Sequence, residues 1–181
     1  YAEEARDLDG LVERIDAAGT LREELAALPG PVLRPARPAQ ARVPGSATRL
    51  PPATRSDARS PANLRLPVDG RTLRGFGSVD RSGARSEGLA IRAGGGAQVV
   101  TPAAGRVAFA GPFRGYGRIV IIEHPDGWTS LVTGLARTDV SVGEQLTEGA
   151  PLGVAPPEGG AIGFELRLGG RPANPLDHLS N

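Results

Sequence analysis

The stretch that decides the fold runs from Gly115 to Leu131 and reads Gly-Tyr-Gly-Arg-Ile-Val-Ile-Ile-Glu-His-Pro-Asp-Gly-Trp-Thr-Ser-Leu. A glycine-flanked turn precedes a run of β-branched residues, and a His-Pro-Asp-Gly turn separates that run from the next. Short apolar runs bounded by Gly and Pro are typical of β-strands joined by tight turns. The stretch therefore predicts two strands, Arg118–Glu123 and Trp128–Val132.

The same pattern extends in both directions, from Leu64 to the end of the sequence. No helical period intervenes, so the pattern favours a sandwich or small barrel over βαβ units. We expect a mainly β domain over residues 64–181. Its further expected strands are Leu73–Phe76, Leu89–Ile91, Gln98–Val100, Gly105–Ala110, Leu152–Val154 and Ala161–Leu168.

Residues 1–29 have a different character, with eight acidic residues against three arginines. Apolar residues at helical spacing predict an amphipathic helix with one apolar stripe. The stripe consists of Leu8, Leu11, Val12 and Ile15. We expect Gly19 to interrupt this helix and Thr20 with Glu23 to cap a second one. The segment is either an ordinary amphipathic helix that seeks an apolar partner or a dedicated regulatory element.

Residues 30–63 separate the helical segment from the β domain. Residues 31–63 contain seven prolines and six arginines, opposed only by Asp57, and show no periodicity. This composition is typical of a flexible linker. Interleaved aromatic residues are lacking and the whole chain carries a net charge of only +1, so we expect no nucleic-acid partner.

Composition excludes several chemistries. The chain of 181 residues has no Cys, and all 21 basic residues are Arg, so thiol nucleophiles and modified-lysine carriers are excluded. No apolar run approaches the roughly 18 residues that span a bilayer. The lack of Met suggests a processed or truncated piece. We expect structural or surface roles for His124 and His178, and core positions for Trp128 and Phe109.

Four further motifs give the β domain a family resemblance. They are Val99–Val107, Val140–Gly153 with its glycines and apolar residues at steps of three, Phe164–Arg167 and Gly170–Leu179. Together with Gly115–Leu131, they make residues 66–179 resemble the LytM or lysostaphin-type zinc peptidases. The resemblance implies a LytM-like β-sandwich with a barrel-sandwich-like core.

The resemblance also implies a zinc site, and its ligand positions can be located. Active members hold zinc with His-x-x-x-Asp and the second His of His-x-His, and another His assists catalysis. The corresponding positions here are Ser86, Ala90, Gly134, Ala161 and Gly163. Zinc needs three or four N, O or S ligands at about 2.0–2.3 Å, which these residues do not supply. We therefore expect a pseudoenzyme with no metal and no cofactor.

Among degenerate relatives, the chain is similar to the EnvC-type murein hydrolase activators, in which a coiled coil precedes a LytM domain. This resemblance implies that the vacated groove binds an N-acetylmuramoyl-L-alanine amidase and frees its zinc site. It also implies a periplasmic location at the division septum of a Gram-negative bacterium. Residues 1–29 would be the end of a coiled coil that connects to a division-associated ABC-type membrane complex.

We expect small and amphipathic side chains to line the groove. The predicted lining is Glu87, Ala90, Tyr116, Val132, Gly163 and Arg167. A further hypothesis is that the stripe of Leu8, Leu11 and Ile15 occupies the groove in cis, as an autoinhibitory helix. The alternatives are a passive peptidoglycan-binding module, for which peptidoglycan is the ligand, and an active zinc endopeptidase.

Overall fold

The computed structural model describes residues 9–15, 17–19, 61, 63–80 and 83–180. The expected second helix, almost all of the expected linker, and Leu8 lie outside these residues. Within the described part of the chain, no helix is both long and apolar enough to cross a membrane.

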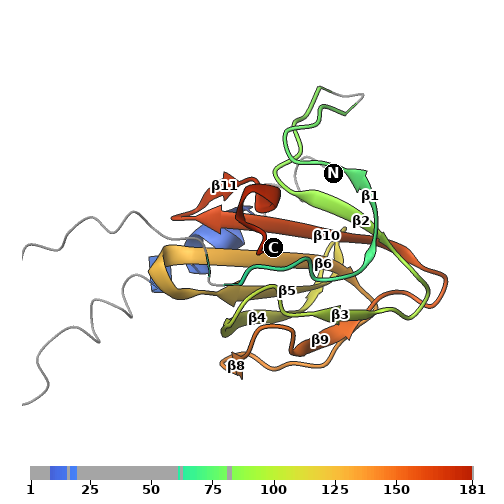
Figure 1. Cartoon of the computed structure of the whole chain (residues 1–181). Helices are drawn as coiled ribbons and strands as arrows, with labels where there is room; N and C mark the ends of the chain where they lie inside the picture. Colours follow the sequence, from blue (N-terminus) through green and yellow to red (C-terminus); the bar gives the residue numbers. More distant parts are fainter. Residues whose placement is uncertain (1–8, 16, 20–60, 62, 81–82, 181) are drawn as a thin grey trace, which may run out of the picture.

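Most strands belong to one antiparallel sheet (Figure 1). Its hydrogen-bonded order is β1-β2-β10-β6-β5-β4-β8, and β11 pairs with the end of β10. In that order the strands are Gly70–Arg74, Leu89–Ala93, Gly160–Leu168, Trp128–Leu135, Gly117–Glu123, Gly105–Phe113 and Gln145–Leu146, with β11 at Arg171–Ala173. The two strands expected from Gly115–Leu131 pair directly as a hairpin, since β5 and β6 are joined by the Pro125–Gly127 turn.

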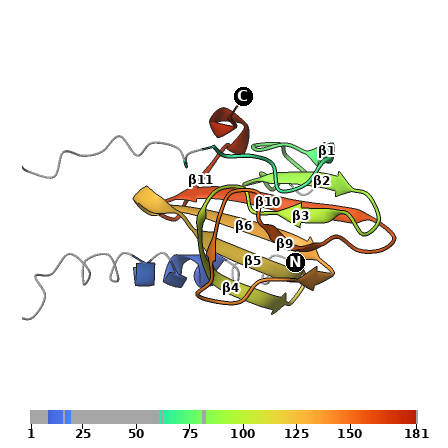
Figure 2. The same ribbon diagram turned by 60° about the horizontal axis from the view of Figure 1, so that its bottom comes forward.

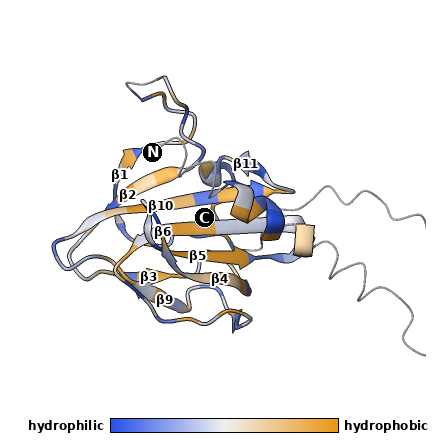
Figure 3. Cartoon of the chain, turned by 180° about the vertical axis from the view of Figure 1, so that it is seen from behind, coloured by the Kyte–Doolittle hydropathy of each residue, from blue (hydrophilic) through white to orange (hydrophobic). Residues whose placement is uncertain are grey.

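A second sheet of three strands completes the sandwich. Its order is β3-β9-β7, with bounds Gln98–Val100, Pro151–Val154 and Arg137–Thr138. Val99 and Leu152 of this sheet are fully buried, in one cluster with Ile162 and Phe164 of β10. Alternate residues of each strand therefore point into one core between the two sheets. Figure 3 shows the apolar residues concentrated on these strands.

The opposite face of the large sheet carries a helical segment, residues 9–15 and 17–19 (Figure 2). Val12 is fully buried there in a second apolar cluster with Ile119 and Ile121 of β5 and Leu131 of β6. Gly19 is itself helical, so the expected interruption at this residue is wrong. A Cβ at Gly19 would lie 3.0 Å from Glu123 Oε1, so the glycine lets the helix approach the sheet closely.

The expected strands are present, with shifted ends. The first is Gly70–Arg74 instead of Leu73–Phe76, because the Ser78 hydroxyl donates to the Gly75 carbonyl at 2.7 Å and the chain turns. The fourth extends past Ala110 to Phe113, since Gly111 and Pro112 continue to pair with β5. Short strands β7, β8 and β11 were not expected. They are two or three residues long and have no apolar run of their own.

Candidate functional site

The predicted site lies on the face of the large sheet that points away from the core, which we call the outer face. Residues paired directly across an antiparallel ladder point to the same side of a sheet. Ala90 of β2 pairs with Gly163 of β10, and Gly163 pairs with Thr133 of β6. Two positions farther along β10, Glu165 pairs with Leu131, and then Arg167 pairs with Thr129. These residues form one continuous surface.

The helical segment covers part of the outer face. Val12 inserts between Ile119, Ile121 and Leu131, all of which are buried. Leu11 and Ile15 are half-buried against the same cluster, as expected for a stripe at helical spacing. Full burial of one aliphatic side chain contributes about 1.5–3 kcal/mol relative to exposure, so this contact holds the helix on the sheet.

Arg167 forms the polar end of that contact. Its guanidinium donates to Asp9 of the helix at 2.6 Å, and to Glu87 and Glu165 at 3.0 Å each. The Arg167 side chain is only 7% exposed. Burial raises the pKa of the Glu165 carboxyl, and the adjacent Arg167 charge opposes that rise. One buried cation thus holds three carboxylates, of which only Asp9 comes from outside the β domain.

Ala90 and Gly163, two of the positions at which zinc ligands are expected from the sequence, are neighbours on the outer face. Neither residue has a side-chain atom that could bind a metal. The Ser86 hydroxyl donates a hydrogen bond to the Gly88 carbonyl at 2.9 Å. A Cβ at Gly163 would lie 2.3 Å from Thr133 Oγ1, so Thr133 fills the space that a larger side chain would need. Among the residues that the structure describes, no group of three His, Cys, Asp or Glu could hold a metal.

Gly134, the expected position of the histidine that assists catalysis, has no room for a side chain. It has a φ of 83°, and a Cβ there would lie 2.4 Å from the carbonyl oxygen of Ala161. A histidine at this position would require the two strands to move apart. The residues present therefore do not fit a zinc ion.

Tyr116 lies in the turn between β4 and β5, at the edge of the outer face. Its ring is half-buried, 6.3 Å from that of Phe113, and its backbone carbonyl accepts from Gly134 N–H at 2.9 Å. Both aromatic rings pack against the cluster that contains Val12. Tyr116 is therefore part of the surface on which the helix lies.

The structure brings most of the predicted groove residues to one surface, with one exception. Glu87 contacts Arg167, Ala90 lies beside Gly163, and Tyr116 borders the same face. Val132 does not line it, and that prediction is wrong. Val132 is fully buried in the core between the sheets, because its neighbours Leu131 and Thr133 take the outward positions.

Three residues that matter here were missed as site residues: Asp9, Val12 and Glu165. Period two along β10 puts Glu165 on the face of Gly163 and Arg167, which the sequence does reveal. Val12 belongs to the predicted stripe. Nothing in the sequence pairs Asp9 with a residue 158 positions away.

The two histidines and the tryptophan have roles away from this face. His124 is buried, with Nδ1 2.7 Å from the Ala104 carbonyl and Nε2 2.8 Å from Ser130 Oγ, and burial lowers its pKa. His178 packs edge-on against Trp128, which is buried in the core as expected. Phe109 is half-buried beside the helix.

A cavity of about 430 Å³ lies next to His124, and its lining includes Trp128 and Arg106. The expected zinc-ligand positions do not line this cavity.

Residues 84–175 match the model of peptidase family M23. The murein hydrolase activator EnvC of Escherichia coli is 36% identical over 117 residues, 62% of this chain and 28% of that protein. The murein hydrolase activator NlpD of Salmonella dublin is 32% identical, over 75% of this chain and 37% of that protein. The cell division protein DipM of Caulobacter vibrioides is 35% identical, over 56% of this chain and 17% of that protein. The chain thus spans well under half of these relatives.

Solved structures agree with these matches. A putative M23 peptidase of Pseudomonas aeruginosa superposes with a TM-score of 0.53 and 27% identity, over 65% of this chain and 52% of that one. Csd3 of Helicobacter pylori superposes with a TM-score of 0.59 over 66% of this chain and 33% of that one. Its identity is 24%, so it supports the fold alone.

Proposed function

Because the chain belongs to peptidase family M23, and relatives over the same region are named murein hydrolase activators, we propose that it activates peptidoglycan hydrolysis during cell division without cutting peptidoglycan itself. The observation that carries the proposal is the outer face. At the expected zinc-ligand positions it carries Ala90 and Gly163, and Gly134 of β6 stands where the histidine that assists catalysis is expected. An amphipathic helix lies on the adjoining surface.

The absence of catalytic activity follows from the side chains at those positions. A zinc peptidase needs three protein ligands and an open position for water. Serine, alanine and glycine at the corresponding sites leave at most one hydroxyl, and that of Ser86 is already donated to a backbone carbonyl.

The proposed partner is a periplasmic zinc N-acetylmuramoyl-L-alanine amidase at the division septum. A surface that holds a helix through buried aliphatic contacts and one buried arginine suits an amphipathic helix of a partner protein. Tyr116 and Arg167 are the types of residue that contribute most to such interfaces. Arg167 is already desolvated, so a partner carboxylate that replaced Asp9 would add no further desolvation cost for the arginine itself.

The helical segment is proposed to regulate this surface in cis. Val12, Leu11 and Ile15 occupy the aliphatic cluster that the partner helix would use. A partner must then compete with a segment of the same chain, whose effective concentration is high. Release of the segment, by a pull from upstream residues, would expose the surface.

The test is hydrolysis of dye-labelled sacculi by a purified amidase of the same bacterium, with and without this chain. We expect the chain alone to release no dye, and dye release by the amidase to rise when the chain is added. Arg167→Ala and Tyr116→Ala should each weaken amidase binding by about thirtyfold, the usual loss for a central interface residue. Arg171→Ala, an exposed arginine on β11, is the control and should stimulate like wild type.

Metal analysis separates this proposal from a peptidase. After dialysis the chain should contain far less than one zinc per molecule and should leave muropeptides intact. One zinc per chain together with muropeptide cleavage would contradict the proposal. Binding to sacculi without any effect on the amidase would instead indicate a passive peptidoglycan-binding module.

A further inference from the structure

Three arginines lie on the outer face beside the vacated zinc positions. Arg71 of β1 pairs with Arg92 of β2, and Arg92 pairs with Ala161 of β10. In the next pair on this side of the sheet, Arg74 of β1 lies opposite Ala90, the neighbour of Gly163. We call Arg71, Arg74 and Arg92 the arginine cluster. By register, all three belong to the side of the sheet that carries Arg167.

The cluster is exposed, and the described residues place no counter-charge against it. All three arginines are exposed, and none of them has an ion pair or side-chain hydrogen bond with another described residue. Arg167, on the same face, has three carboxylates around it. The positive charge at the β1–β2 end of the face is therefore not neutralised by the described part of the domain.

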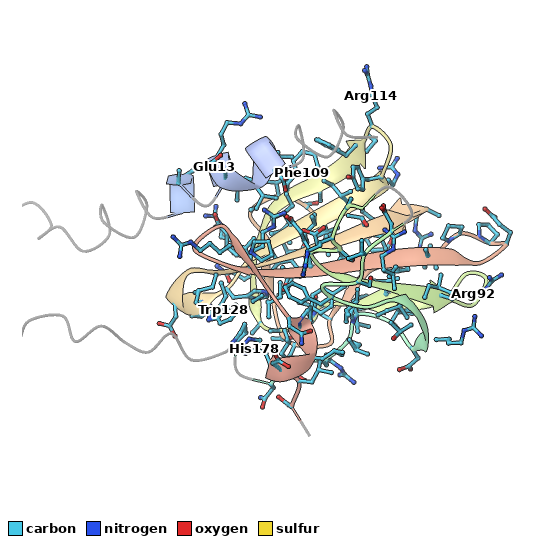
Figure 4. All side chains as sticks on the ribbon, turned by 90° about the horizontal axis from the view of Figure 1, so that it is seen from above. Glu13, Arg92, Phe109, Arg114, Trp128 and His178 are labelled. Carbon is cyan, nitrogen blue, oxygen red and sulfur yellow. The ribbon has the colours of Figure 1, made fainter. Side chains whose placement is uncertain are left out.

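The described helical segment does not reach the cluster. Its contacts are with Arg167 and with the apolar residues of β4, β5 and β6. In Figure 4, Arg92 lies on the opposite side of the view from Glu13 of the helix. The described part of the helix therefore covers the other end of the face and leaves this end uncovered.

The sheet surface beside the arginine cluster is made of small residues, which allow a peptide backbone to approach. Ala90 and Gly163 are half-buried and Ala161 is exposed, so these three positions beside the cluster carry at most a methyl group. Arginine forks bind carboxylates through two parallel hydrogen bonds. The cluster is thus chemically matched to a chain that presents several carboxylates.

We propose that the arginine cluster is the first docking site for an acidic segment of the partner hydrolase, engaged while the helical segment still covers the rest of the face. The inference rests on the proposed function and adds the chemistry of the partner. The same face already holds one acidic helix, through the Asp9–Arg167 ion pair. A partner bound at the cluster could then extend along β2 and β10 and replace that helix, because the surface is continuous.

The experiment measures binding of a fluorescein-labelled oligo-glutamate peptide to the full chain by fluorescence anisotropy. The variant carries Arg71→Gln, Arg74→Gln and Arg92→Gln. The matched control carries Arg114→Gln, Arg118→Gln and Arg171→Gln, which removes the same charge from exposed positions elsewhere. At about 50 mM salt, where screening is weak, we expect the variant to lose about tenfold in affinity and the control less than twofold.

Two results of the peptide assay would overturn the proposal. Equal binding by variant and control would show that the cluster has no special affinity for carboxylates. A tenfold gain on replacing Glu3, Glu4 and Asp7 by glutamine would show that the chain's own acidic residues occupy the cluster, not a partner.

Amidase binding and sacculus pull-down distinguish the remaining ligands. With the amidase, we expect the variant to show about tenfold slower association and an unchanged level of stimulation at saturation. Arginine-dependent binding to sacculi, with unchanged amidase association, would overturn the proposal in favour of peptidoglycan. If the wild-type chain fails to stimulate any amidase, the proposed function fails, and the peptide assay still decides whether the cluster binds carboxylates.

Discussion

Asp9 and Arg167 are 158 positions apart in the chain and are joined by a 2.6 Å ion pair on the outer face of the large sheet. The arginine is buried and belongs to the β domain, whereas the aspartate is half-exposed and belongs to the helical segment. The pair therefore ties the segment to the surface that we propose for the partner. Removing the aspartate leaves Arg167 with Glu87 and Glu165, so the surface survives the loss of the helix.

Asp9→Ala should loosen the helical segment and leave the β domain intact. An ion pair with one half-exposed partner contributes up to about 1 kcal/mol, so we expect up to about fivefold tighter amidase binding. Hydrogen exchange at residues 10–15 should accelerate, with no change in the strands. The control is Glu13→Ala, an exposed carboxylate on the same helix. Equal exchange rates in wild type and Asp9→Ala would contradict the role of the ion pair.

Val12→Glu should release the segment more completely. It removes a fully buried aliphatic side chain and would place a carboxylate among Ile119, Ile121 and Leu131, at a cost of several kcal/mol to the docked state. Amidase binding should tighten by more than in Asp9→Ala. The gain in affinity is limited by the ratio of docked to released helical segments in the wild-type chain. Glu13→Leu, its exposed neighbour, is the control. Unchanged amidase affinity in Val12→Glu would rule out occlusion in cis.

Stability should fall in mild acid because of His124. Since a carbonyl oxygen can only accept, Nδ1–H donates to Ala104 O, and Nε2 accepts from the Ser130 hydroxyl. Burial lowers the folded-state pKa below 6.5, so below pH 6.5 the unfolded chain binds the additional proton. The free energy of unfolding should then drop by as much as about 1.4 kcal/mol per pH unit until the folded-state pKa is reached.

Chemical denaturation at several pH values measures this slope. His124→Gln should be less stable at neutral pH and should lose the part of the slope that lies below pH 6.5. His178→Gln, which changes the other histidine, should keep it. A slope that is the same in wild type and His124→Gln would refute the assignment.

Gly134→Ala should destabilise the fold more than an ordinary glycine substitution in a turn. Its φ of 83° costs about 1–2 kcal/mol for alanine, and the 2.4 Å approach to the Ala161 carbonyl adds about 1–3 kcal/mol of overpacking. Gly127→Ala has a similar φ of 74° with open space around it, and isolates the cost of the dihedral alone. Equal losses in the two variants, measured by thermal unfolding, would show that β6 and β10 can separate at this point.

Local sequence patterns were sufficient for the strands that form the core. β5 and β6 are runs of β-branched and apolar residues bounded by glycine and proline turns, and burial of alternate residues favours only one pairing face. The ends of the strands were less accurate, because pairing can continue through residues with weak strand propensity. Pro112 in β4 is such a residue, held by its register with Arg118.

The candidate site was predictable only in part, because some of its features are local and others depend on how the strands pair. The expected absence of histidine and aspartate at the zinc-ligand positions rests on residue type, and the common face of Gly163 and Arg167 follows from period two. Both are local properties. The prediction that Val132 lines the groove was wrong, because which residues of β6 point outward depends on its register with β5 and β10.

The sequence by itself predicted a mainly β domain, an amphipathic helix that includes residues 9–15, and expected zinc-ligand positions without histidine or aspartate. Each of these is a property of neighbouring residues or of a residue type. Only the tertiary structure decided that Val12 and Asp9 lie on the outer face and that Arg71, Arg74 and Arg92 share one end of it. Such contacts join distant segments, and their free energy depends on shape and charge that exist only after the sheet has formed.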